Sequence, residues 1–155
     1  MIVYNRSTEH DLLLARWWAI LCETGELRTT FAKSIESLSS FYALFHPPSV
    51  LLFFTDANGI WLAAWFESVL SGAFMGLWSR QDKRKSRSAF RAVLSIYRQA
   101  LVTWPVLIGV TKQEKLIDQH QRLGYTLLGK IPCLFDGEDA FVLVLTKQTF
   151  RDREV

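Results

Sequence analysis

"LIGVTKQEKLIDQHQRLGYTLLGKI", residues 107–131, holds a strand, a helix and a second strand in close succession. The short apolar run at 106–110 does not alternate, which is typical of a strand buried on both faces and reached by a helical crossover. Helical spacing follows from about residue 112 to 123, and Gly124 can close that helix. Residues 125–131 then favour another strand. The stretch therefore predicts a β-α-β unit.

Further strands lie on both sides of this unit. Toward the C-terminus, a loop through Pro132, Asp136 and Gly137 leads to a last strand at 140–146. Upstream, residues 50–55 and 60–66 predict a hairpin that turns at Asp56, Asn58 and Gly59, and residues 73–79 add a third antiparallel strand. A helix after this meander has apolar residues at 3, 4 and 7 spacing and ends at Trp104 and Pro105; its inward positions are Phe90, Val93, Leu94, Tyr97 and Leu101.

The N-terminal third predicts a short strand at 1–4 and two helices. Ser7 or Thr8 caps the first helix, whose inward face is His10, Leu14, Trp17, Trp18 and Leu21. Thr29 or Thr30 caps the second, which ends at Pro47 and Pro48 and turns inward Phe31, Ile35, Leu38 and Phe41 or Tyr42. The complete order predicts an α+β fold, with a mixed sheet of about six or seven strands and about four helices, in one domain over residues 1–155.

The composition sets limits on function. The chain has 155 residues, 50% of them hydrophobic, which is enough for a real core. Cys22 and Cys133 are far apart in apolar surroundings, so we expect buried, reduced thiols and a cytoplasmic location. Histidines and cysteines lack metal-ligand spacing, which predicts no metal. Polar residues interrupt the N-terminal stretch that a signal peptide would need to be apolar, so we do not expect export through a signal peptide. No later run approaches the ~18 apolar residues of a membrane span, so a membrane partner is not expected either.

A basic stretch, "QDKRKSR" at 81–87, precedes the helix that follows the meander. Cations at a helix N-terminus are unfavourable unless an anion sits among them, so the stretch raises the question of a bound anion. A solvated basic face is the simplest alternative. Another is nucleic acid, because six cations could follow one helix edge and contact backbone phosphates: Lys83, Arg84, Lys85, Arg87, Arg91 and Arg98.

The element order and residues 107–131 resemble the GNAT N-acetyltransferase superfamily, over about residues 1–147. The family pattern N-x-x-A-x-x-L-Y-x-x-x-G-F falls here with Gln113 for the Asn and His120 for the Tyr, while Gly124 and Tyr125 match its end. The family's pyrophosphate loop, Q/R-x-x-G-x-G/A, falls on "RKSRSA" at 84–89, with an arginine at 87 in place of the central glycine. That substitution changes how a phosphate can approach the backbone.

The resemblance implies an acyl-CoA-dependent N-acyltransferase, with acetyl-CoA or a related thioester as co-substrate and an amine acceptor of unknown identity. It implies a general acid at His120, although His120 also fits an apolar helix stripe. Glu67, the acidic residue near the expected centre of the sheet, is the candidate base, directly or through water, although it also fits a solvent-exposed strand end. The resemblance also implies a splayed strand whose backbone pairs with pantetheine, and a cationic loop around the pyrophosphate. The implied CoA-binding residues are Leu77, Trp78, Ser79, Arg80, Lys83, Arg84, Lys85, Ser86, Arg87, Ser88, Ala89 and Gln113.

Two other functions stay open. The glycine-poor loop is similar to that of phage-encoded GNAT-like proteins of the virion or of head assembly, which implies a structural or interaction protein without catalysis. In that case the location is the host cytoplasm or the virion, and the partner a virion protein. Aromatic residues beside a basic groove would also suit an enzyme that modifies a nucleobase. A homodimer is compatible with each of these functions.

Overall fold

The computed structural model describes residues 1–31 and 33–152. Seven strands form one mixed sheet in the order β1-β2-β3-β4-β5-β7-β6. They are β1 (Ile2–Val3), β2 (Val50–Asp56), β3 (Gly59–Val69), β4 (Gly72–Ser79), β5 (Val106–Thr111), β6 (Thr126–Phe135) and β7 (Glu138–Thr146). The helices are α1 (Thr8–Thr24), α2 (Leu27–Thr30), α3 (Leu38–Ala43), α4 (Arg87–Thr103) and α5 (Ile117–Arg122), with 3-10 turns η1 (Gln81–Lys83) and η2 (Glu114–Leu116). The predicted α+β class, mixed sheet and meander are confirmed.

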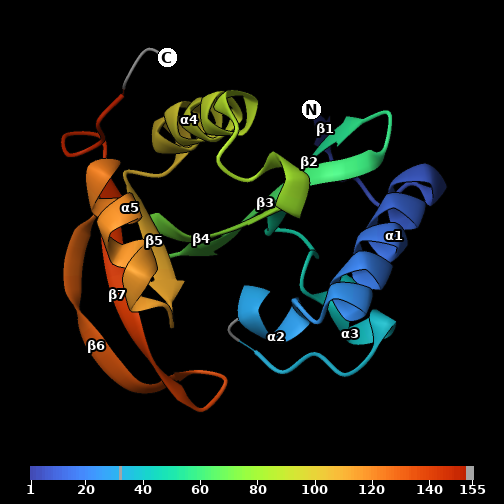
Figure 1. Cartoon of the computed structure of the whole chain (residues 1–155), viewed down its shortest axis with the longest axis horizontal. Coiled ribbons are helices and arrows are strands. Elements are labelled where there is room, and N and C mark those ends of the chain that lie inside the picture. The colour runs from blue at the N-terminus through green and yellow to red at the C-terminus, as the bar shows by residue number, and fades with distance from the viewer. Residues whose placement is uncertain (32, 153–155) are drawn as a thin grey trace.

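Helices cover both faces of the sheet (Figure 1). Alternation along β3 shows the division, because Ala63 and Trp65 pack with α1, α2 and α3, whereas Leu62 and Ala64 pack with α4. We call these two sides the α1 face and the α4 face. Each has its own hydrophobic cluster, centred on Trp17 on the α1 face and on Tyr97 on the α4 face.

A serine caps each of the two long helices, and the cap at Ser7 was predicted. Ser7 caps α1 by accepting a hydrogen bond from the His10 N–H (3.2 Å), and α1 ends at Gly25, which has a φ of 69°. Ser86 caps α4 in the same way, with its Oγ accepting from the Ala89 N–H (3.1 Å). The cap at Ser86 fixes where the basic stretch ends and the helix starts.

The predicted second helix is wrong. The structure has two short helices instead, and the predicted caps Thr29 and Thr30 are the last residues of α2. Ser37 starts α3 by accepting from the Ser40 N–H, which a continuous helix would not need. The inward residues Phe31, Ile35 and Phe41 are nevertheless buried, so the apolar spacing found the core but not the backbone conformation.

Other boundaries also differ. The helix expected at 112–123 is the turn η2 followed by the six residues of α5. β6 continues through Pro132, where its pairing with β7 is irregular, so the loop is only the turn at Asp136 and Gly137. Cys22 and Cys133 are both exposed rather than buried. Within residues 1–31 and 33–152, no helix has the length and apolarity needed to cross a membrane.

Candidate active site

The sheet opens between its two central strands. β4 and β5 run parallel but pair only at Ala73 with Leu107 and at Phe74 with Ile108, near the start of both strands. Beyond these pairs the strands separate, so the gap widens toward Ser79 on one side and Thr111 on the other. The expected splay of the strand before the basic stretch is therefore confirmed.

The direction of the β4 backbone into this gap follows from its pairing with β3. The Arg80 N–H donates to the Trp61 carbonyl of β3 (2.9 Å), and the register alternates regularly from there, so Trp78 also directs its backbone groups to β3. Leu77 and Ser79 then direct theirs into the gap, where β5 does not reach them. The Ser79 carbonyl already accepts a hydrogen bond from Arg84 Nε (3.0 Å). The Ser79 N–H is therefore the group of this residue that still needs a partner. Unpaired strand groups of this kind need a partner.

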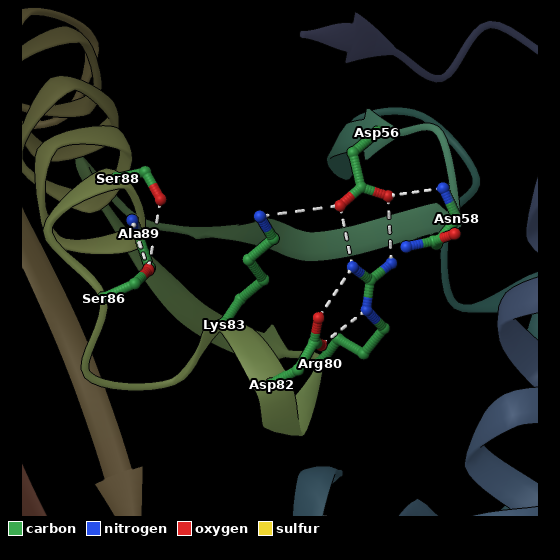
Figure 2. A network of polar contacts seen from close by, with 8 residues as sticks. All are labelled: Asp56, Asn58, Arg80, Asp82, Lys83, Ser86, Ser88 and Ala89. Carbon is green, nitrogen blue, oxygen red and sulfur yellow. Dashed lines mark hydrogen bonds and ion pairs between the residues drawn. The ribbon is translucent and has the colours of Figure 1, made fainter.

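A polar network braces the loop at the open end of the gap (Figure 2). Arg80 donates to both oxygens of Asp56 (3.1 and 2.7 Å) and to Asp82 through Nε (2.6 Å). Lys83 also lies 3.7 Å from Asp56. The hydrogen bonds from Arg80 hold the pKa of Asp56 at about 2, below its ordinary value. Arg80 thus ties the β2–β3 turn to the loop after β4.

The remaining cations of the loop divide into paired and unpaired groups. Arg84 forms an ion pair with Glu26, beside α2. Lys85 has a positive φ of 67°, and neither its side chain nor that of Arg87 forms an ion pair or hydrogen bond with the part of the chain that the structure describes. Five cations at 80, 83, 84, 85 and 87 thus face three carboxylates, a local net charge of +2. The excess lies at the N-terminus of α4, where Arg87 and Ser88 have N–H groups without helical acceptors.

A pocket of about 370 Å³ lies on the α1 face, next to the gap. Aromatic side chains from separate elements line it: Phe31, Phe45, Trp65, Phe74 and Phe135. Glu67, Lys33, Thr30 and Ser49 supply its polar groups, while Leu134 and Phe135 come from the β6–β7 hairpin, which extends below the sheet toward α2 (Figure 1). Ile108 and Gly76 border it from the two separating strands, so the pocket reaches the sheet where the gap opens.

Trp65 takes its position in this pocket because Gly76 has no side chain. A Cβ built on Gly76 would lie 2.0 Å from Cε2 of the Trp65 indole, far inside contact distance. The indole thus lies against the β4 backbone, and it stacks on Phe31 with ring centres 4.7 Å apart. Trp17 packs against it from α1, with ring centres 5.6 Å apart. The rings hold one another in a single arrangement.

His120 lies on the α4 face, in α5. Its Nδ1 is 2.6 Å from the Leu116 carbonyl oxygen. Because a carbonyl only accepts hydrogen bonds, Nδ1 is the ring nitrogen that carries the proton, and Nε2 is the nitrogen at which a second proton can bind. The ring packs edge-on against Tyr125 (ring centres 5.1 Å apart), and its Cδ2 edge, next to Nε2, is turned to Gly109 of β5. Burial raises the pKa of Tyr97 to about 12 and raises that of Tyr125 as well, so both rings stay neutral beside His120.

The two predicted catalytic residues lie on opposite faces of the sheet. Glu67 follows Trp65 on the α1 face and lines the pocket, although its side chain is exposed, as the alternative prediction had it. Gln113 occupies the N-cap position of η2, two residues after β5 ends at the open end of the gap, and its side chain makes no capping hydrogen bond. Glu67 lines the pocket that Gly76 and Ile108 border, and His120 lies beside Gly109 of β5, so each is next to at least one of the two strands that separate at the gap.

Two features of the site were not predicted from the sequence. The aromatic pocket draws on residues from positions 31 to 135, and only the folded sheet brings them together. The acidic partners of Arg80 and Arg84 were also missed, because Asp56 and Glu26 are 24 and 58 residues away. Among the described residues, no three His, Cys, Asp or Glu side chains gather as metal ligands would. With Arg84 bound to Glu26 and Arg98 to Asp152, the basic edge considered for nucleic acid is partly neutralised.

No protein-family model matches the sequence, and no curated protein matches it. Solved structures do match. Spermidine N-acetyltransferase from Vibrio cholerae, in complex with CoA and spermine, is 9% identical with a TM-score of 0.73 and 96% of each chain covered. The ribosomal-protein-S5-alanine acetyltransferase from Vibrio fischeri is 10% identical, with a TM-score of 0.71 over 96% of this chain and 94% of that one.

An aminoglycoside 6'-N-acetyltransferase, complexed with coenzyme A, gives a TM-score of 0.66 at 12% identity, over 94% of this chain and 97% of that one. These likenesses extend across the whole seven-stranded sheet and its helices rather than one motif. At such low identities they establish architecture alone. The chain therefore has the GNAT acetyltransferase fold.

Proposed function

We propose that the protein is an acetyl-CoA-dependent N-acetyltransferase, and that the CoA thioester lies in the gap between β4 and β5. The observation that supports this most strongly is the splay itself: Leu77 and the Ser79 N–H direct unpaired backbone groups into it. A pantetheine arm carries two amides, which would complete these bonds as a further strand does.

The pyrophosphate would bind at the N-terminus of α4. The N–H groups of Arg87 and Ser88 and the helix dipole favour an anion there, and Lys85 and Arg87 supply the unpaired positive charge. Arg87 stands where the family has a glycine, and its exposed side chain can add a guanidinium to a phosphate. Arg80, Lys83 and Arg84 would act mainly by shaping the loop, because each has an acidic partner.

In the proposed reaction, the nitrogen of a neutral amine attacks the thioester carbonyl carbon from the pocket on the α1 face. A C–N bond forms and the C–S bond breaks. The amine gives up a proton to Glu67, directly or through water. The leaving thiolate takes the Nε2 proton of a doubly protonated His120, which is left as the neutral ring with its proton on Nδ1. The products are an amide and free CoA. Since acetyl-CoA is an intracellular metabolite, the reaction would take place in the cytoplasm.

Calorimetric titration with CoA tests the proposal. We expect stoichiometric binding with a micromolar Kd that weakens as salt rises, because the loop carries excess charge. The double variant Lys85→Ala, Arg87→Ala should bind about tenfold or more weakly, as one charge-assisted contact contributes at least that much. Arg16→Ala, an exposed arginine of α1, is the matched control and should bind normally.

Folded protein that gives no heat at millimolar CoA would overturn the proposal. The GNAT fold would then serve a structural or interaction role, as the phage-like alternative has it. Weakened binding in the Arg16→Ala control equal to that in the double variant would show a nonspecific charge effect and would remove the α4 N-terminus as the phosphate site.

A further inference from the structure

The pocket on the α1 face indicates which amine is acetylated. We propose that the acceptor is a small monoamine carried on a flat apolar group, such as an aromatic ring on a short alkyl chain, and not a polycation. This inference rests on the N-acetyltransferase function proposed above. It assigns to this chain a substrate class different from the polyamine and aminoglycoside named for two of its structural neighbours.

The walls of the pocket suit an aromatic group. Trp65 and Phe31 stack on each other, and Trp65 lies flat on β4 at Gly76, so their rings are fixed rather than adaptable. Phe45 packs behind them against Trp17, and Phe74 and Phe135 add two further rings to the lining. Flat rings bind other flat rings by offset or edge contacts in addition to apolar burial.

The size of the pocket favours a small molecule. Its volume of about 370 Å³ is near the lower end of the roughly 300–1,000 Å³ usual for ligand pockets. Phe74, on β4, pairs with Ile108 at the last contact between β4 and β5, directly below the gap. An aromatic group among these side chains would place an amine on its short chain at the thioester.

The charges of the pocket disfavour a polycation. Glu67 and Lys33 are the charged residues of the described lining, so the pocket holds one carboxylate and one ammonium group, and no net charge. A polyamine or aminoglycoside has several ammonium groups, each of which loses hydration on entry and needs an acidic partner. A monoamine needs one. Apolar walls also favour the neutral form of the amine, which is the form that attacks.

The experiment measures acetylated product by mass spectrometry, because the exposed Cys22 and Cys133 would react with a thiol-detecting dye. Phenethylamine is compared with spermidine and kanamycin at saturating acetyl-CoA. We expect kcat/KM for phenethylamine to exceed that for either polycation by about tenfold or more, the discrimination that a pocket readily gives. The Phe-Gly-Gly tripeptide tests a peptide N-terminus, which we expect to be a poorer acceptor.

Two phenylalanines provide matched variants. Phe74 is 38% exposed and lines the pocket, while Phe90 is 37% exposed and lies in α4 on the other side of the sheet. Phe74→Ala should raise the KM for phenethylamine about tenfold with unchanged CoA binding, and Phe90→Ala should leave the KM unchanged. Phe74→Glu, which adds a second carboxylate, should shift the preference toward spermidine.

The outcomes separate the two proposals. Absence of CoA binding overturns the acetyltransferase function and the acceptor class together. Normal CoA binding overturns the acceptor class alone if spermidine, kanamycin or the tripeptide is preferred, or if phenethylamine is not acetylated. A normal KM for phenethylamine in folded Phe74→Ala would also contradict the inference, because the pocket would then not hold the aromatic group.

Discussion

Gly76→Ala tests the arrangement of the pocket most severely. The new methyl group would lie 2.0 Å from Cε2 and 2.1 Å from Cζ2 of Trp65. Carbon atoms normally approach to about 3.5 Å, so the indole would have to move about 1.5 Å. Phe31 and Trp17 oppose this movement from its other sides. Overpacking of this kind costs about 1–3 kcal/mol, and we expect the upper half of that range because the ring is confined.

Chemical denaturation measures this loss as a change in the free energy of unfolding. A loss of about 2–3 kcal/mol corresponds to a decrease in Tm of about 4–12 °C for a chain of this size. Gly109→Ala is the matched control, because a Cβ there would lie 3.4 Å from Cε1 of Tyr125. Since that distance is close to ordinary contact, we expect a loss of at most about 1 kcal/mol.

The Trp65→Leu substitution should relieve the clash in the double variant. The two substitutions should therefore be non-additive by about 1 kcal/mol or more, with the double variant more stable than the sum of the single effects predicts. Two results would contradict this packing: a loss of stability for Gly76→Ala no larger than that for Gly109→Ala, or additive effects of Gly76→Ala and Trp65→Leu. Either result would mean that the indole does not lie against the β4 backbone.

Three further predictions concern the loop and the surface. Arg80→Ala should lower Tm, because it leaves Asp56 and Asp82 without their main partner, whereas Arg87→Ala should leave Tm unchanged; thermal unfolding of both variants compares them. Because the folded-state pKa of Asp56 is about 2, below its ordinary value of 3.8, its ion pair stabilises the fold above about pH 4 and is lost as pH falls toward 2. Stability measured across this interval should fall less steeply in Asp56→Asn. A maleimide should label both Cys22 and Cys133 in the native protein, and protection of either thiol would contradict its exposure.

The secondary structure was predicted best where the local sequence pattern and the burial of the side chains indicate the same element. The hairpin at 50–66 and the cap at Ser7 depend on neighbouring residues, and both were predicted. The second helix was not, because Phe31, Ile35 and Phe41 have helical spacing yet reach the core from a partly extended chain. Spacing indicates which side chains are buried, but several backbone paths can bury the same side chains.

The candidate site shows the same division. The splay followed from the resemblance, and the position of the basic loop followed from residues 81–87 and the helix pattern after them. Which cations of the loop are paired could not be predicted, because the pairing depends on Glu26 and Asp56, which only the tertiary structure brings to the loop. The acceptor pocket depends on single side chains from α2, β3, β4 and the β6–β7 hairpin. No local sequence pattern indicates that these side chains lie together in the fold.

Residue-resolved amide hydrogen exchange of β4, with and without CoA, is the most direct test of the proposed thioester site. We expect the amides of Leu77 and Ser79 to gain protection when CoA is added, because they point into the gap. The amide of Trp78 should change little, since its backbone already faces β3. Equal changes at all three residues, or no change in β4 while CoA binds, would contradict the placement of CoA between β4 and β5.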